Sequence, residues 1–155
     1  MIGEKLLVLG LFASPAPTGM QSRLRDVALF STLSPRELKV VSTLIHQRSA
    51  LAGEVIFDEG EEGQAIYFVF SGEIMICHQG HAASPIAMMG AGRIFGELAL
   101  IDGGPRSAQA RAAKDCELGV MFRGDFQNLM ESHASIVTKI SFQLARHYAG
   151  IIRML

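Results

Sequence analysis

The sequence predicts an α+β domain that is mainly β, in which an antiparallel barrel or jelly roll lies between helices. Three observations lead to this fold class. Short apolar runs alternate with glycine-rich turns over residues 47–123, which is typical of many short antiparallel strands. Apolar residues at helical spacing precede this region, over 21–46, and follow it, over 124–155. We interpret residues 1–20 as an N-terminal extension.

Length, charge and cysteine content narrow the class of protein. A chain of 155 residues, 49% of them apolar, is long enough for one domain with a buried core. Its 14 basic and 15 acidic residues leave a net charge of −1, so the composition favours neither nucleic acid nor an anionic membrane as a partner. Cys77 and Cys116 lie far apart in predicted strands, and we expect buried free thiols, as in a reduced cytoplasmic protein.

The first segment allows two interpretations. The apolar run 6–13 could be the core of a signal peptide, or a short helix or strand that packs on the domain. Glu4 offsets the charge of Lys5, and residues 14–16 make a poor cleavage site, so the second interpretation is favoured. The run is also too short to span a membrane. Residues 14–19 contain two prolines and a glycine and are predicted to be a linker.

Two helices are predicted before the strands. The first runs from Gln21, and its buried face consists of Leu24, Val27, Ala28 and Leu33. The second opens with Ser34 as N-cap, Pro35 at the first helical position and Glu37 completing a capping box. Its apolar stripe consists of Leu38, Val41, Leu44 and Ile45. His46 follows, and we expect it to be a partly exposed cap of this helix.

The predicted strands form one series separated by turns. The clearest is 65–70, which is rich in aromatic and β-branched residues. The full series is 52–57, 65–70, 73–77, 86–89, 92–95, 108–113 and 116–122.

A long apolar stripe characterises the last segment. Phe126, Leu129 and Met130 share one helical face. The spacing that follows is close to a heptad repeat, and its members are Ile136, Val137, Ile140, Leu144, Tyr148, Ile151 and Leu155. Such a stripe fits a helix that covers the barrel.

One stretch, residues 95–112, carries residue types that suit an anionic ligand. Gly96 allows a tight turn close to a ligand, and the five residues after it favour one helical turn whose free N–H groups attract an anion. The chain then returns extended and presents Arg106, a planar fork for phosphate oxygens, beside the hydroxyl of Ser107. Glu97 adds an acceptor for hydroxyl groups. Together these groups predict a site for a phosphorylated sugar.

The order Gly-Glu-Leu-Ala-Leu, a short break and then Pro-Arg-Ser-Ala closely resembles the phosphate-binding cassette of cyclic-nucleotide-binding domains. These domains occur in catabolite activator proteins, regulatory subunits of cAMP-dependent protein kinase and cyclic-nucleotide-gated channels. Gly53, Gly60, Gly63 and Gly72 match the glycine positions of the family's β-roll. The resemblance covers about residues 25–150 and implies an antiparallel β-roll with N-terminal helices and C-terminal lid helices.

The resemblance also implies roles for particular residues. Arg106 would bind the exocyclic oxygens of a cyclic phosphate, and Glu97 would accept a hydrogen bond from the ribose 2′-hydroxyl. The ligand-binding residues that it implies are Gly96, Glu97, Leu98, Ala99, Arg106, Ser107 and Ala108. The C-terminal helix would close over the purine, with Leu144 and Ile151 as candidate lid residues, and would form a seam between two copies of the chain.

We therefore expect a cytoplasmic sensor that binds cAMP or cGMP, performs no chemistry and needs no cofactor. The printed sequence resembles no output domain outside this region, so we expect an unidentified effector protein to respond to it. Two alternatives stay open. One is a relative of transcription factors that sense redox state or haem; the other is a phosphodiesterase acting on the same nucleotide, which would need a metal or a poised nucleophile.

An acidic turn and a pair of histidines contain residue types that can bind metals. The acidic turn 58–62 lacks the alternate ligands and closing glutamate of a calcium loop, so we expect a solvated turn. His78 and His81 could supply half of a metal site, but no third ligand stands at a suitable spacing. The sequence therefore predicts loop histidines and no bound metal.

Overall fold

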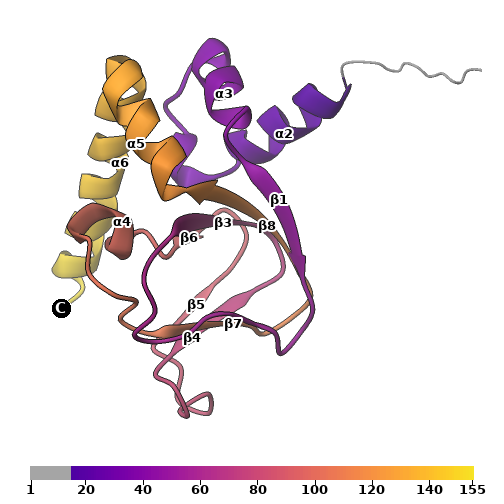
Figure 1. Cartoon of the computed structure of the whole chain (residues 1–155), viewed down its shortest axis with the longest axis vertical. Coiled ribbons are helices and arrows are strands. Elements are labelled where there is room, and N and C mark those ends of the chain that lie inside the picture. Colours follow the sequence, from indigo (N-terminus) through magenta and orange to yellow (C-terminus); the bar gives the residue numbers. More distant parts are fainter. Residues whose placement is uncertain (1–14) are drawn as a thin grey trace, which may run out of the picture.

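Two four-stranded antiparallel sheets form a β-roll, with helices gathered at one end (Figure 1). The computed structural model describes residues 15–155. One sheet has the strand order β1-β8-β3-β6 and the other β2-β7-β4-β5, which confirms the predicted fold class. The strands are β1 (His46–Ala50), β2 (Val55–Phe57), β3 (Ala65–Ser71), β4 (Ile74–Cys77), β5 (Ala87–Met89), β6 (Ile94–Phe95), β7 (Gln109–Ala112) and β8 (Cys116–Phe122).

Strand β3 is apolar along nearly its whole length because both of its faces are buried. Ile66 and Phe68 face the helices and belong to one hydrophobic core. Tyr67 and Val69 point to the opposite face and belong to a second core, between the two sheets. The strand pairs with β8 from Ala65 onward, in antiparallel register. A strand between two cores has no polar face, and this is why the sequence reads as a continuous apolar run.

The helices cover the outer face of the β1-β8-β3-β6 sheet and form most of the first core. They are α2 (Pro15–Arg25), the 3₁₀ turn η1 (Ala28–Phe30), α3 (Pro35–Ser42), α4 (Leu98–Asp102), α5 (Arg123–Ser132) and α6 (Ala134–Arg153). The predicted capping box of α3 is confirmed: the Ser34 N–H donates to Glu37 Oε1 at 2.8 Å, and the Glu37 N–H donates to Ser34 Oγ at 3.2 Å. This reciprocal pair satisfies two N–H groups of the first turn.

The N-terminal helices differ from the prediction. Helix α2 begins at Pro15, so residues 15–19 are not the expected linker; proline is tolerated in a first helical turn, where its missing N–H is not needed. The helix ends at Arg25 and a separate 3₁₀ turn follows, so the helical period does not continue. As a result Ala28 is exposed, whereas Leu29 and Phe30 are buried. The apolar run 6–13 lies outside the described residues.

Strand β1 was missed because it has no apolar pattern. It lies at the edge of its sheet and pairs only with β8, and only Ala50 among its five residues is buried. His46 begins this strand and is exposed, with its ring 5.1 Å from the ring of Phe122, so it is not the cap of α3. An edge strand with a solvated face tolerates polar residues, which removes the alternation that sequence analysis depends on.

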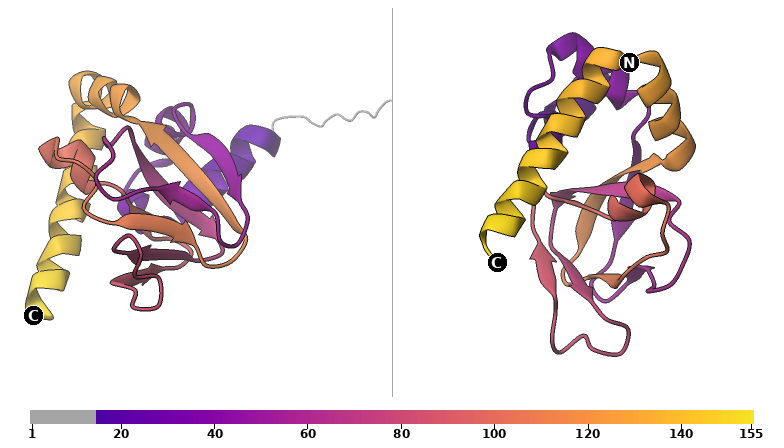
Figure 2. Two further views of the ribbon diagram at one scale, coloured as in Figure 1. Left: turned by 60° about the horizontal axis from the view of Figure 1, so that its bottom comes forward. Right: turned by 90° about the vertical axis from the view of Figure 1, so that its left-hand side faces the viewer.

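The apolar stripe of α6 has two different environments. Ile136 and Ile140 are buried in the core, and Leu144 packs partly against it. Ile151 and Leu155, by contrast, are 44% and 97% exposed. Figure 2 shows the reason, since the C-terminal part of α6 extends along the side of the roll, away from α2, α3 and α5. The stripe therefore packs into the core along its first half, and farther along it Tyr148 is only partly buried.

Both cysteines are buried and free, as the sequence predicted. Over residues 15–155, no helix combines the length and the apolar character needed to cross a membrane.

Glu37 connects α3 to α6, and its ionisation contributes to stability. Its carboxylate accepts hydrogen bonds from Lys139 Nζ at 2.7 Å and from Ser135 Oγ at 2.9 Å. The bond from Lys139 and the capping bond from Ser34 lower the pKa of Glu37 from 4.5 to about 2. The stabilising contribution is complete above pH 4.5 and is lost as the pH falls toward 2.

We predict that Glu37→Gln lowers the free energy of unfolding at pH 7, and that the difference from the parent protein shrinks as the pH approaches 2. Urea unfolding at several pH values measures this. Glu131→Gln is the matched control, because Glu131 is exposed on α5 and makes no side-chain hydrogen bond within residues 15–155. A difference that does not depend on pH would show that the Lys139 contact is not the source.

Candidate functional site

A cavity of about 150 Å³ opens between α4 and the inner face of the roll. The structure brings the seven residues predicted from the sequence together in its wall: Gly96, Glu97, Leu98, Ala99, Arg106, Ser107 and Ala108. Apolar side chains complete the lining, from Phe57, Ile76, Met89, Phe95 and Pro105. One part of the cavity is therefore polar and the other apolar, as a ligand with a charged end and a flat apolar end would require.

The main chain at Arg106 is held by the acidic turn that precedes β3. The Arg106 N–H donates to Glu61 O and the Gly60 N–H donates to Arg106 O, both at 2.8 Å. Pro105 forms an isolated bridge with Glu62 in the same short ladder. Residues 105 and 106 are thus extended and paired on one side, and this pairing directs the side chain of Arg106 into the cavity wall.

The Arg106 side chain is almost completely buried, with 5% of its surface exposed. Nη1 donates to Gly96 O at 2.7 Å and Nη2 donates to Ala65 O at 2.8 Å. The guanidinium carbon lies 3.9 Å from the centre of the Phe57 ring, in position for a cation–π contact. Two carbonyls and one aromatic face therefore hold the cation in place.

The charge of Arg106 has no carboxylate partner in the part of the chain that the structure describes. Its Nε is buried and also lacks an acceptor there. Burial lowers the pKa of Arg106, but an arginine keeps its proton at neutral pH. A buried cation without a counter-charge is costly, and an anion bound beside it would reduce that cost.

Main-chain N–H groups add to the positive character of this wall. The N–H groups of Leu98, Ala99 and Ser107 donate to no main-chain acceptor within residues 15–155. Leu98 and Ala99 lie in the first turn of α4, where N–H groups have no partner inside the helix. Such groups, together with Arg106, form a cradle for a phosphate.

Two glycines allow the close packing around this cradle. Gly96 has φ +80°, and a Cβ at this position would lie 2.8 Å from Nη1 of Arg106. A Cβ on Gly63 would lie 2.1 Å from the Cβ of Ala99 in α4. The first glycine is needed both for its backbone conformation and for the approach of the guanidinium, and the second for the approach of α4.

Glu97 is already engaged by a residue that sequence analysis did not assign to the site. The hydroxyl of Tyr148, in α6, donates a hydrogen bond to Glu97 Oε2. Burial and this bond both raise the pKa of Tyr148, so its hydroxyl is a donor at neutral pH. The signal was present in the sequence, because Tyr148 is the one residue with a polar end in the α6 stripe.

The two predicted lid residues do not line the cavity. Leu144 packs against the helical core and Ile151 is exposed. Their role over a bound base remains a prediction, and it requires α6 to change position.

Arg123, the first residue of α5, is a second contact that the sequence did not reveal. Its Nη2 donates to Ala99 O at 3.0 Å, so α5 is hydrogen-bonded to a main-chain carbonyl of α4. Residues 99 and 123 are distant in the sequence, and no motif spacing connects them.

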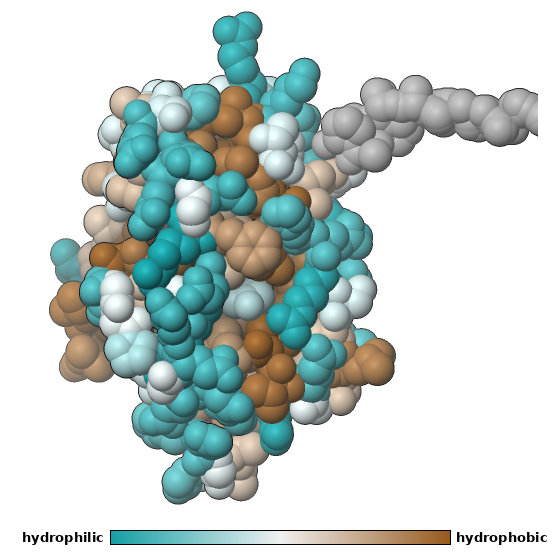
Figure 3. Space-filling view, viewed as in Figure 1, coloured by the Kyte–Doolittle hydropathy of each residue, from teal (hydrophilic) through white to brown (hydrophobic). Residues whose placement is uncertain are grey.

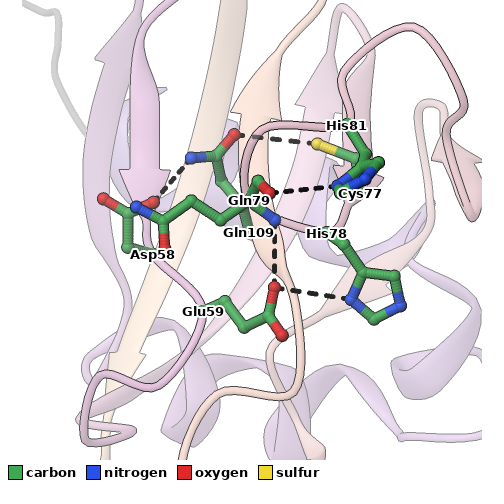
Figure 4. Close-up of polar contacts among 7 residues, drawn as sticks. All are labelled: Asp58, Glu59, Cys77, His78, Gln79, His81 and Gln109. Atoms are coloured by element: carbon green, nitrogen blue, oxygen red, sulfur yellow. Dashed lines mark hydrogen bonds and ion pairs between the residues drawn. The ribbon is translucent and has the colours of Figure 1, made fainter.

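The acidic turn contacts His78 and Gln79, whereas His81 Nδ1 lies 3.1 Å from Gln79 O (Figure 4). Glu59 Oε1 accepts the Gln79 N–H at 2.9 Å and lies 3.4 Å from Nδ1 of His78. Asp58 accepts a hydrogen bond from Gln109 Nε2 at 2.5 Å. Among the described residues, no group of three or more His, Cys, Asp or Glu side chains could hold a metal ion. These contacts join the turn before β3 to the loop after β4.

Comparisons with known proteins agree with this geometry. Residues 47–133 match the family described as cyclic nucleotide-binding domain. The cyclic AMP receptor protein of Thermus thermophilus is 36% identical over 120 residues, which are 76% of this chain and 56% of that protein. The regulatory domain of Toxoplasma gondii PKA, solved with cAMP, is 27% identical with a TM-score of 0.68, covering 84% of this chain and 51% of that one.

A cyclic nucleotide-binding domain from Methylobacillus flagellatus supports the fold, with a TM-score of 0.76, 22% identity and coverage of 90% of this chain and 80% of that one. The chain belongs to the cyclic nucleotide-binding domain family. The chain spans about half the length of the Thermus protein, and less of several other curated relatives.

We predict that Gly96→Ala destabilises the protein by about 1–2 kcal/mol, the usual cost of placing a Cβ in the left-handed region. Displacement of Arg106 Nη1 should add to this cost. Urea unfolding measures the change. Gly53→Ala is the matched control, since Gly53 has φ +90° and a Cβ at this position meets open space. Equal effects of the two substitutions would contradict the packing described for Arg106.

Proposed function

We propose that this domain is a regulatory module that binds cAMP reversibly in the cavity beside α4 and performs no chemistry on it. The cyclic phosphate lies against Arg106 and the free N–H groups of Leu98 and Ala99, while the purine contacts the apolar wall. The observation that carries the proposal is the buried Arg106 cation without a carboxylate partner among the described residues. A bound phosphate would supply the missing negative charge.

Ligand binding can change the position of α6. Tyr148 uses the Glu97 carboxylate, which is the acceptor that a ribose 2′-hydroxyl would need. We propose that the ribose replaces Tyr148 at Glu97 and so frees the C-terminal half of α6. The helix could then shift and bring Leu144 and Ile151 toward the base. The nucleotide can shift the equilibrium toward this state by no more than the difference between its affinities for the two states.

The exposed end of α6 is the surface we propose for a protein partner, either a second copy of the chain or an effector. Hydrophobic side chains gather where this end lies, at the left edge of Figure 3. They come from Ile151, Ile152, Met154 and Leu155. Large exposed apolar side chains in one place are typical of interaction sites. The buried free thiols suit the reducing cytoplasm, which is where we place the protein.

Calorimetry of the nucleotide-free protein tests the function directly. We expect saturable binding of cAMP, at least as tight as that of cGMP, because no lid side chain offers a polar group to distinguish the purines. The nucleotide recovered afterwards should be unchanged. Absence of binding by either nucleotide would reject the proposed ligand, and recovery of the linear monophosphate would show that the domain is a phosphodiesterase.

We predict that Arg106→Leu weakens cAMP binding by about 3–5 kcal/mol, roughly two to four orders of magnitude, because the phosphate loses its charge partner. Arg106→Lys should recover part of this loss, since an ammonium keeps the charge but not the fork. Glu97→Gln should cost less than either, because it changes one ribose contact. Calorimetry measures all three.

Because Arg106 also binds the carbonyls of Gly96 and Ala65, each variant must first be shown to be folded by circular dichroism. If folded Arg106→Leu binds cAMP within a few-fold of the parent, the cassette does not bind the phosphate.

We predict that Tyr148→Phe binds cAMP about fivefold more tightly than the parent, because roughly 1 kcal/mol of hydrogen bond no longer has to be broken. The 2′-deoxy analogue does not need Glu97, so its affinity should not change. Parallel titrations of both ligands with both proteins measure the coupling. Weaker cAMP binding by the variant would mean that Tyr148 supports the bound nucleotide instead of competing with it.

A further inference from the structure

A second cavity, of about 220 Å³, lies between α6 and the turn that leads into β6. It shares no lining residue with the cavity beside α4. Its wall consists of Ala28, Leu29, Gly92, Arg93, Ile94, Gln143, Arg146 and His147. No role in the proposed nucleotide site accounts for this concentration of basic side chains.

The charges around this cavity are all of one sign. Arg93 and Arg146 carry permanent positive charges, and His147 offers a ring N–H in either protonation state. No aspartate or glutamate lines the cavity, and neither arginine forms an ion pair with a carboxylate of residues 15–155. Asp26 lines a neighbouring cavity, which also contains Arg23 and shares Gly92 with this one.

The two arginines come from different elements, and both are exposed residues that line this cavity. Gln143, Arg146 and His147 lie on one face of α6, at the helical spacing of three and four residues. Arg93 lies in the facing turn, whose position is set by a hydrogen bond from the Ala28 N–H to Gly92 O at 3.2 Å. Two guanidinium groups that line one cavity from two elements suit a tetrahedral anion with several oxygen acceptors.

We propose that this cavity is a second ligand site, which binds a small phosphate-bearing anion between Arg93 and Arg146 with Gln143 and His147 as further donors. The bound anion would join α6 to the roll. His147 is the neighbour of Tyr148, and their rings lie 5.1 Å apart, so this junction is next to the residue that contacts Glu97. The assignment rests on this cavity alone and does not depend on which nucleotide occupies the first one.

The test is a titration of ¹⁵N-labelled protein with inorganic phosphate and with pyrophosphate, at constant low ionic strength, followed by amide chemical shifts. Amides of residues 92–94 and 143–147 should move on one saturable curve, with a dissociation constant on the order of 1 mM and tighter binding of the more highly charged pyrophosphate. Amides of residues 96–99 report separately on the first cavity. Sodium chloride should give no saturable change.

Substitutions show which side chains are responsible for the chemical-shift changes. The double substitution Arg93→Gln/Arg146→Gln should weaken pyrophosphate binding at the second cavity at least tenfold. Arg153→Gln, on the same helix but outside the cavity lining, is the matched control and should leave it unchanged. Arg106→Leu should remove only the response of residues 96–99. Lack of saturation with both phosphate probes, an equal response to chloride, or an undiminished response in the double variant would overturn the proposal.

Discussion

The placement of one buried cation, Arg106, constrains most of the structure around the cavity. Its guanidinium lies between two main-chain carbonyls and the face of Phe57, where water cannot solvate it. Charge in such an environment is tolerated only with close and well-aligned partners. The glycine at position 96, the extended pairing of residues 105 and 106 with the acidic turn, and the strand end at Ala65 all follow from this requirement.

Local contacts also tie the cradle to the helices. Arg123 holds the carbonyl of Ala99, and Tyr148 holds the carboxylate of Glu97, so α4 is connected to α5 and α6 by one side chain each. Figure 1 shows α4 on the side of the roll along which α6 passes. A ligand that competes for one of these contacts changes the relative free energies of the positions open to α5 or α6. Such coupling between a ligand and a helix position is what a sensor requires.

Elements that a few adjacent residues define were predicted correctly, and elements that depend on distant partners were not. The capping box at Ser34 and the doubly buried strand β3 were predicted correctly, because a few adjacent residues define each of them. Strand β1 was missed because its partner, β8, lies 70 residues away and supplies the hydrogen bonds that a polar edge sequence cannot indicate. The interruption between α2 and η1 was also missed, since Phe30 is oriented by its contact with Phe68 in β3.

The sequence by itself determined which residues form the cradle, because the order of glycine, carboxylate, helical turn and arginine is contiguous and each member acts through its own chemistry. The tertiary structure decided what those groups contact within the fold. Arg106 is buried against carbonyls contributed by Ala65 and Gly96, and Glu97 is bound to Tyr148, 51 residues further along the chain. Such pairings depend on how the roll and α6 pack, and packing is a property of the whole chain that no local pattern contains.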